Sequence, residues 1–124
     1  MEEVVEHAKK CHPQEGCGLI VGRALGSRFV PMQNTLASST AYEMDPGQLV
    51  NALRELRHTG EELVAIYHSH PHGPARPSQT DIAWAYYPEA AHLIVSLAER
   101  ERPRTAAFRI FEGEAREIEV HVIV

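Results

Sequence analysis

One segment of the sequence constrains the possible folds most. It is a short apolar run that leads directly into two histidines and then into a proline-rich segment. Residues 63–67 are typical of a buried strand, and His68-Ser69-His70 follows them immediately. Residues 71–77 contain three prolines and a glycine, which predicts a loop. The sequence therefore predicts a strand that leaves the protein interior and ends in a pair of histidines at the start of a loop.

The rest of the chain alternates helical and strand patterns. Residues 2–11 carry apolar or small side chains at helical spacing, and Pro13 is expected to end that helix. Asp45-Pro46 is typical of a helix start, and the apolar positions that follow continue to Gly60. Further strands are predicted at residues 17–21, 27–32, 40–44, 93–97, 105–111 and 117–124, with a short helix at residues 78–86. This order predicts a mixed α/β (α+β) fold with helices against one curved mixed β-sheet.

Composition and charge narrow the function classes. The 124 residues are 44% hydrophobic, and 12 Lys and Arg stand against 17 Asp and Glu, a net charge of -5. This acidic balance gives no reason to expect a nucleic acid or an anionic membrane as a partner. The acidic start Met1-Glu2-Glu3 lacks the positive region of a signal peptide, and no apolar run approaches the ~20 residues that span a bilayer. We therefore expect one cytoplasmic domain over residues 1–124.

Histidine, rather than cysteine, marks the candidate site. Cys11 and Cys17 form no C-x-x-C pair, so neither a disulfide framework nor a thiolate zinc site is predicted. Cys17 lies in a predicted strand and is expected to be a small core residue. Three of the eight histidines fall within residues 68–72, which makes this segment a candidate metal or catalytic site. His72 follows a proline and is expected to be solvated.

The residues around this segment can be combined into a metal site. His68 and His70 are two apart on a strand, so they project from the same face, and two neighbouring imidazoles suit a zinc ion. Ser78 and Asp81 are three apart on a predicted helix and share a face, and Asp81 can supply a third ligand. Three protein ligands leave the fourth position to water, which is typical of a catalytic site. Glu15, directly before the first predicted strand, is the candidate general base.

Each of these residues also has an ordinary structural interpretation. Ser78-Gln79-Thr80-Asp81 is a good helix-capping sequence, although a residue at a helix start can also face a metal. Strand histidines such as His68 often only hydrogen-bond in place, and a residue such as Glu15 is mostly a surface acid. These interpretations stay open for each residue taken alone.

Residues near the candidate site have both packing and binding interpretations. Backbone groups of Tyr42 and Glu43 could hold an extended substrate tail by adding it to a sheet edge. The alternative is an edge strand that leads to the next helix and contacts no substrate. Trp84 and Tyr87 are expected to pack the short helix onto the sheet.

Taken together, the polar residues resemble the signature of the JAMM (also called MPN+) metalloprotease family. That signature is a remote Glu, then H-[ST]-H-P, a spacer, and S-x-x-D. It is matched here by Glu15, by residues 68–71, and by Ser78 and Asp81, which follow His68 by ten and thirteen positions. The resemblance covers nearly the whole chain and implies the cytidine-deaminase-like JAMM/MPN fold.

The resemblance also implies a role for each position. His68, His70 and Asp81 would bind one zinc ion per chain, and Glu15 would be the general base and acid. Ser78 would donate its hydroxyl to the oxyanion on the scissile carbonyl. Family members are peptidases or isopeptidases that cut after the C-terminal Gly-Gly of ubiquitin or ubiquitin-like proteins.

The compact length of the chain refines this expectation. Eukaryotic deubiquitinating members carry insertions that hold ubiquitin, and this chain lacks them. It resembles the bacterial and archaeal members that act on ubiquitin-like sulfur carriers and release a C-terminal cysteine or a conjugated protein. The sequence leaves open which carrier is cut and which leaving group departs.

Two other function classes fit the sequence less well. A non-catalytic scaffold of the same fold usually loses one or more of the metal-binding or acidic positions. Here every position of the signature is present: Glu15, His68, His70, Ser78 and Asp81. A zinc deaminase also uses one zinc and one Glu, but it needs H-x-E with a later P-C-x-x-C, and the sequence contains neither. An exposed edge strand or the apolar residues 120–124 could serve a homodimer.

Overall fold

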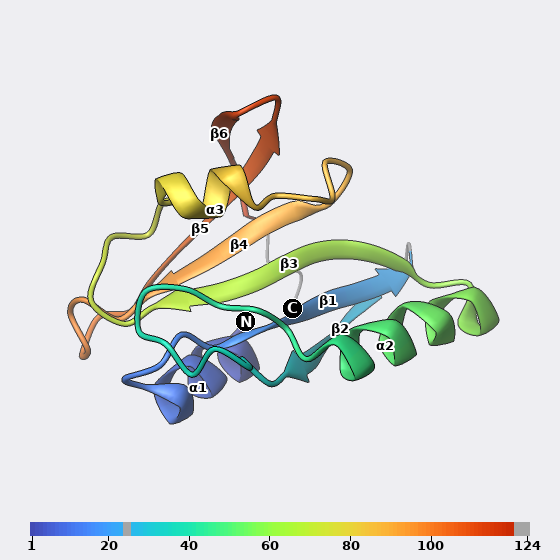
Figure 1. Ribbon diagram of the computed structural model, residues 1–124, viewed down its shortest axis with the longest axis horizontal. Helices are drawn as coiled ribbons and strands as arrows, with labels where there is room; N and C mark the ends of the chain where they lie inside the picture. Colours follow the sequence, from blue (N-terminus) through green and yellow to red (C-terminus); the bar gives the residue numbers. More distant parts are fainter. Residues whose placement is uncertain (24–25, 121–124) are drawn as a thin grey trace.

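The computed structural model describes residues 1–23 and 26–120, in which helices pack on both faces of a six-stranded sheet (Figure 1). In chain order the elements are α1 (Glu2–Cys11), β1 (Cys17–Arg23), β2 (Gly26–Met32), α2 (Pro46–Thr59), β3 (Glu62–His70), α3 (Gln79–Ala83), β4 (Ala91–Ser96), β5 (Arg104–Phe111) and β6 (Glu114–Ile118). The strands lie in the order β2-β1-β3-β4-β5-β6. Only β3 and β4 pair in parallel, so the sheet is mixed, as predicted.

Local sequence signals set the helix ends. The Asp45 side chain accepts a hydrogen bond from the Gln48 N–H at 3.0 Å at the start of α2, and Gly60 ends this helix with φ of +74°. The helix α3 ends at Ala83, earlier than predicted, because the Ala85 N–H reaches only the Ile82 carbonyl, at 3.4 Å. Among the described helices, none has the length and apolar character that crossing a membrane requires.

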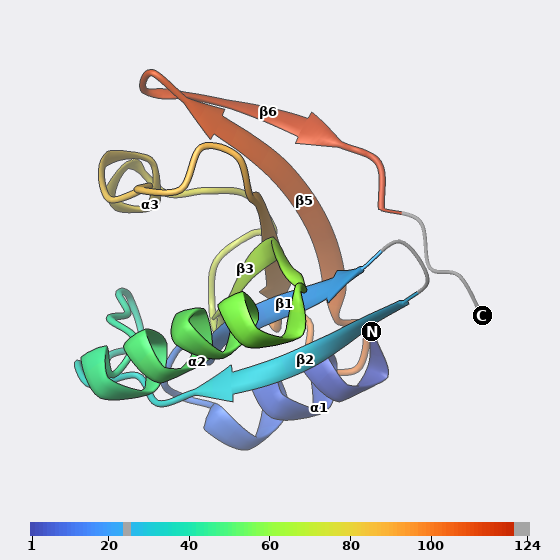
Figure 2. The same ribbon diagram turned by 90° about the vertical axis from the view of Figure 1, so that its right-hand side faces the viewer.

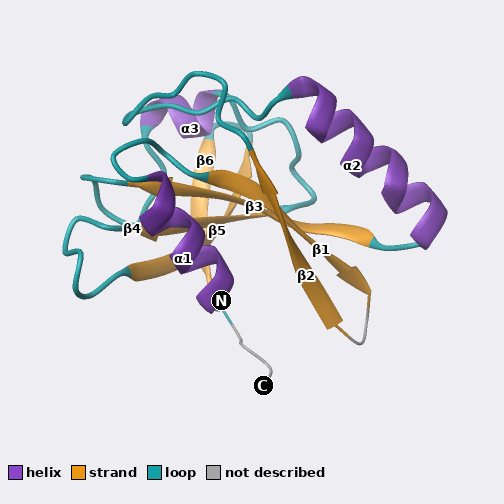
Figure 3. Cartoon of the chain, turned by 90° about the horizontal axis from the view of Figure 1, so that it is seen from below, coloured by secondary structure: helices purple, strands orange, loops and turns teal. Residues whose placement is uncertain are grey.

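The sheet has one face under α1 and the opposite face under α2 and α3 (Figures 2 and 3). The core under α1 contains Val4, Ala8, Tyr67, Leu93, Val95, Leu97 and Ala107. The core on the opposite face contains Cys17, Leu19, Val21, Met32, Met44, Ile66 and Ala90, against which α2 packs. Because side chains alternate along β3, His68 and His70 share a face with Ile66 and lie on the side of α2 and α3. The predicted burial of Cys17 is confirmed.

The predicted strand at residues 40–44 is wrong. Apart from an isolated bridge to Asn34, the described residues form no strand there. The Asn34 side chain makes hydrogen bonds that a neighbouring strand would otherwise make. It accepts from the Glu43 N–H and donates to the carbonyls of Glu15 and Ala41, each at 3.1 Å. The segment is therefore a loop, and Asn34 links it by hydrogen bonds to Glu15, the residue before Gly16.

The last hairpin differs from the prediction at its turn. Glu112 and Gly113 have φ of +50° and +77° and form a two-residue turn between Phe111 and Glu114, so β6 starts three residues before its predicted position. It ends at Ile118, and residues 121–124 of the predicted strand lie outside the described residues. The edges of the sheet are β2 and β6, and pairing of an edge in a homodimer stays a prediction.

Gly16 sits where a side chain has no room, and this gives a first prediction. A Cβ at Gly16 would lie 2.6 Å from the hydroxyl oxygen of the buried Tyr67. We expect Gly16→Ala to lower the free energy of unfolding by about 1–3 kcal/mol, as overpacking does, in denaturant unfolding experiments. Tyr67→Phe removes the clashing oxygen, so the same glycine change should be milder in that background. Equal losses in both backgrounds would contradict this explanation.

Candidate active site

The two histidines at the end of β3 and the first turn of α3 meet at one point. His68 Nε2 and His70 Nε2 are 3.1 Å apart, and Asp81 Oδ2 lies 3.1 Å from the first and 3.0 Å from the second. In a tetrahedral zinc site with bonds of about 2.0–2.1 Å, neighbouring ligand atoms are separated by about 3.3 Å. The fold therefore brings these three side chains together in a triangle close to the size that a zinc ion requires.

The pairing of β1 with β3 sets the position of the histidines. Ser69, which lies between them, faces the opposite side of the sheet and accepts a hydrogen bond from the Gly16 N–H at 2.7 Å. The Ser69 N–H donates to the Gly16 carbonyl at 3.0 Å. This double link places His68 and His70 beside Glu15, although more than fifty positions separate them in the sequence.

A capping box sets the position of Asp81. The Asp81 N–H donates to the Ser78 hydroxyl at 3.0 Å, and the Ser78 N–H donates to Asp81 Oδ2 at 2.9 Å. The same carboxylate oxygen contacts both histidines. The capping interpretation is therefore confirmed, and it is compatible with a metal site because the cap aims the carboxylate at the imidazoles.

The ring of His70 has a defined tautomer. Its Nδ1 lies 2.8 Å from the Pro74 carbonyl oxygen, which can only accept, so Nδ1 carries the proton. The lone pair of Nε2 is then free to face His68 Nε2 and Asp81 Oδ2, an arrangement that metal-binding histidines commonly adopt. The ring of His68 is fully buried, and the Tyr42 ring stacks on it with centroids 4.7 Å apart.

The pKa shifts of His68 and Asp81 favour the neutral imidazole and the ionised carboxylate that a divalent cation binds. Burial lowers the pKa of His68, which keeps this ring neutral. Burial also disfavours a charged His70, but Asp81 and the Pro74 carbonyl outweigh it and raise the pKa of His70. Burial acts to raise the pKa of Asp81 as well, and hydrogen bonds from the two histidines outweigh it, so the net shift is downward. Two imidazoles and a carboxylate are a donor set that fits zinc.

Glu15 lies beside the trio with a buried carboxyl group. It is 3% exposed, and its Oε1 has no hydrogen-bond partner among the described residues, so it is not a surface acid. Glu15, His68 and His70 form a group that could hold a metal ion, with one possible ligand atom each within 4.8 Å of the others. Burial raises the pKa of Glu15 to about 7, with a smaller upward effect from Asp81 and an opposing effect from His70. A carboxyl group with this pKa can both take and give a proton near neutral pH.

The Ser78 hydroxyl is available to a ligand. Ser78 is exposed at the start of α3, and its oxygen accepts the capping hydrogen bond from the Asp81 N–H. Its own proton makes no hydrogen bond within the described part of the chain. The hydroxyl can therefore donate to a group bound next to Asp81.

A cavity of about 360 Å³ opens beside Asp81, between α2, β3 and α3. It is lined by Leu19, Ala41, Tyr42, Glu43, Met44, Leu49, Leu63, Ile66, Thr80, Asp81, Trp84, Tyr86, Tyr87 and His92. Tyr42 and Glu43 thus reach the candidate site as cavity residues of a loop. Trp84 is 52% exposed and Tyr86 75%, so the expectation that Trp84 packs onto the sheet is wrong, whereas Tyr87 does pack against the core.

Sequence reasoning missed the role of several lining residues. The aromatic run at residues 84–87 carried a signal for this cavity, since three aromatic side chains follow α3 without helical spacing. His92 gave no such signal, because a single histidine inside an apolar strand pattern is common.

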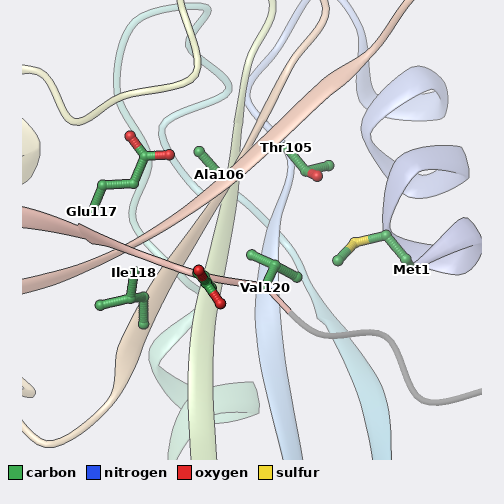
Figure 4. A pocket seen from close by; sticks show the side chains of 7 residues that line it. Met1, Thr105, Ala106, Glu117, Ile118 and Val120 are labelled. Carbon is green, nitrogen blue, oxygen red and sulfur yellow. The ribbon is translucent and has the colours of Figure 1, made fainter.

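A wider cavity, of about 690 Å³, lies elsewhere, between the N-terminus of α1 and the last two strands (Figure 4). It is lined by Met1, Thr105, Ala106, Glu117, Ile118, Glu119 and Val120. None of these is a histidine or a residue of the signature, so cavity size alone does not identify the site.

His72 is exposed, as predicted, and its ring makes an edge-to-face contact with the ring of His12, with centroids 5.4 Å apart.

Comparisons with known proteins identify the family of this chain. The family model described as prokaryotic homologs of the JAB domain matches residues 1–110. The CysO-cysteine peptidase of Mycobacterium tuberculosis is 36% identical over 124 residues, which cover 97% of this chain and 84% of that protein. The "Probable TtuB-protein conjugate cleaving protease" of Thermus thermophilus is 47% identical over 83 residues, which cover 66% of this chain and 56% of that protein.

Solved structures agree in fold. The solution structure of protein DSY2949 from Desulfitobacterium hafniense superimposes with a TM-score of 0.84 at 37% identity, covering 96% of this chain and 85% of the other. The crystal structure of AF2198, a JAB1/MPN domain protein from Archaeoglobus fulgidus, gives a TM-score of 0.62 at 19% identity, with 99% and 93% covered. The predicted fold class is confirmed. The chain belongs to the prokaryotic JAB family of JAMM/MPN proteins, and it is a hydrolase of the JAMM type.

Proposed function

We propose that this chain is a zinc-dependent peptidase or isopeptidase of the cytoplasm. It cleaves after the C-terminal Gly-Gly of a ubiquitin-like sulfur carrier and releases cysteine or a conjugated protein. The observation that carries the proposal is the convergence of His68, His70 and Asp81 within 3.1 Å, beside the buried Glu15. Relatives named for cleavage of CysO-cysteine and of TtuB-protein conjugates support this substrate class.

The three convergent side chains would hold one zinc ion per chain. His68 and His70 supply imidazole nitrogens, and Asp81 supplies a carboxylate oxygen that the capping box already orients. A zinc ion bound there supplies Lewis acidity, which lowers the pKa of a water molecule and polarises a substrate carbonyl. We assign Glu15 outside this ligand set, because Asp81 lies within 3.1 Å of both imidazoles, whereas Glu15 is grouped with them only within 4.8 Å. Its raised pKa suits proton transfer.

The chain's own groups then carry out the proton transfers and stabilise charge. Glu15 takes a proton from the attacking water at a carboxylate oxygen and delivers it to the departing nitrogen. The buried position of Glu15 excludes bulk solvent from this exchange. The Ser78 hydroxyl donates a hydrogen bond to the oxygen of the scissile carbonyl as negative charge develops there.

The cavity beside Asp81 accommodates the tail that precedes the scissile bond. Both backbone groups of Glu43 are already used, since its N–H donates to Asn34 and its carbonyl accepts from the Thr35 N–H. We therefore propose that this loop contacts the tail through side chains such as the Tyr42 ring, which also stacks on His68.

Removal of Asp81 tests the ligand set. We expect wild-type protein to hold about one zinc per chain. Asp81→Ala should bind zinc more than about 100-fold more weakly, a larger loss than is typical when a residue that only hydrogen-bonds to a ligand is changed. Elemental analysis after dialysis measures both. Asp45→Ala is the matched control, because it also removes a helix-capping carboxylate but lies on α2. Full zinc retention in a folded Asp81→Ala protein would refute this ligand assignment.

Glu15→Gln separates the chemistry of this residue from its effect on stability. We expect it to keep zinc and to lower turnover by about 10²–10⁴-fold, the contribution of a general base. Metal-free wild type should lose stability as pH rises from 4.5 to about 7, because the carboxyl ionises more readily in the unfolded chain. Metal-free Glu15→Gln lacks this loss, so it should be more stable at pH 8 by up to about 3 kcal/mol.

Turnover of a carrier fusion and denaturant unfolding at pH 5 and pH 8 measure the two effects. Full turnover in the zinc-loaded variant would remove Glu15 from the proton-transfer role. The same pH dependence of stability in both proteins would show that its carboxyl is not held at a raised pKa.

Ser78→Ala tests the hydroxyl donor. We expect turnover to fall by about 10²–10³-fold, as for loss of a single oxyanion donor, with zinc content unchanged. Loss of the cap should lower the free energy of unfolding by only about 1 kcal/mol. Ser78→Thr retains both the cap and the hydroxyl and should keep most of the turnover. A loss of activity that merely follows the unfolded fraction would leave Ser78 with the capping role alone.

A further inference from the structure

His92 is a buried polar residue that the reaction described above does not use. It lies on β4, opposite Ile66 on β3 and Phe108 on β5, and it is 4% exposed. Its Nε2 is buried and has no hydrogen-bond partner among the described residues. Buried polar atoms are nearly always paired, so this nitrogen is open to a partner other than the described residues.

The surroundings of His92 indicate where that partner binds. The residue lines the cavity beside Asp81, together with apolar and aromatic side chains of α2, β3 and the segment after α3. Ile66 is two residues before His68 on the same face of β3. His92 pairs with Ile66 from the neighbouring strand β4, so it lies close to the candidate metal ligands on that face. Burial, with a further effect from His68, lowers the pKa of His92. The ring is then neutral and offers one N–H donor and one acceptor.

An extended peptide is the occupant that fits these features. In the proposed reaction, the substrate tail approaches the metal site through this cavity. Each of its peptide groups must find a partner once it leaves water, and the cavity wall is largely apolar. A neutral imidazole can satisfy either a peptide N–H or a peptide carbonyl.

We propose that His92 is a substrate-binding residue whose Nε2 hydrogen-bonds a main-chain peptide group of the substrate tail, upstream of the Gly-Gly. This inference rests on the proposed function, because it takes that tail as the occupant of the cavity. In the free protein the unpaired His92 Nε2 lowers the stability of the fold. In the complex the same nitrogen raises the affinity for the substrate tail.

The two consequences have opposite signs, which separates a binding role from a structural one. His92→Leu removes the unpaired nitrogen, so its melting temperature should equal or exceed that of the wild type. The same variant should bind a carrier-tail hexapeptide ending in Gly-Gly, the uncleavable product, about 10-fold more weakly. Zinc content and kcat on a carrier fusion should stay close to wild type, while KM rises. His92→Gln keeps a hydrogen-bonding group and should recover part of the affinity.

Calorimetric titration of the hexapeptide into the zinc-loaded and the metal-free proteins measures this directly. His58→Leu is the matched control, because it makes the same change at an exposed position of α2 and should leave affinity unchanged. Replacing one peptide amide at a time by an ester should identify a single position at which His92→Leu causes no further loss.

The possible failures are distinguishable. If wild type binds and cuts the tail but His92→Leu binds it equally well, the role of His92 is overturned and the proposed function stands. A His92→Leu protein that melts lower than wild type with unchanged affinity would show a packing role instead. If wild type neither binds the hexapeptide nor cuts any carrier fusion, the proposed function and the inference both fail.

Discussion

The two hydrogen bonds that join Gly16 to Ser69 tie the ends of β1 and β3 together, and the geometry of the site depends on them. They hold the Ser69 side chain on the face of α1, so the pleat directs His68 and His70 to the opposite face. They also place Glu15, one residue before Gly16, next to those imidazoles. A sheet pairing between distant segments thus brings together the candidate acid–base group and two candidate metal ligands.

This arrangement concentrates groups that a stable core would avoid. Within a few ångströms lie the Asp81 carboxylate, the Glu15 carboxyl with an unpaired oxygen, and the two imidazoles. Removing such groups from water lowers stability unless a partner compensates them, and a bound cation would compensate both carboxyl groups at once. The same reasoning applies to His92, whose Nε2 is also buried without a hydrogen-bond partner among the described residues. The buried atoms without a hydrogen-bond partner among the described residues are Glu15 Oε1, His68 Nδ1 and His92 Nε2, and His92 lines the cavity beside Asp81.

Short-range patterns predicted much of the fold and of the candidate site. The capping signals at Asp45 and Ser78 depend on neighbouring residues, and strand alternation sufficed to put His68 and His70 on one face. The pairing partners of loop 40–44 could not be predicted, because its backbone is held by the Asn34 side chain and by the Thr35 N–H, which donates to the Glu43 carbonyl, in place of a regular strand pairing. The burial of Glu15 was similarly hidden, since the residues that cover it come from other parts of the chain.

A crystal structure of the zinc-loaded protein, with anomalous data at the zinc edge, tests the central claim most directly. Our account predicts one ion between His68 Nε2, His70 Nε2 and Asp81 Oδ2, at about 2.0–2.2 Å from each, with a solvent oxygen as fourth ligand. The Glu15 carboxylate should lie outside bonding distance of the ion and contact that solvent oxygen. An ion bound by Glu15 in place of Asp81, or no ion between these side chains, would contradict the account.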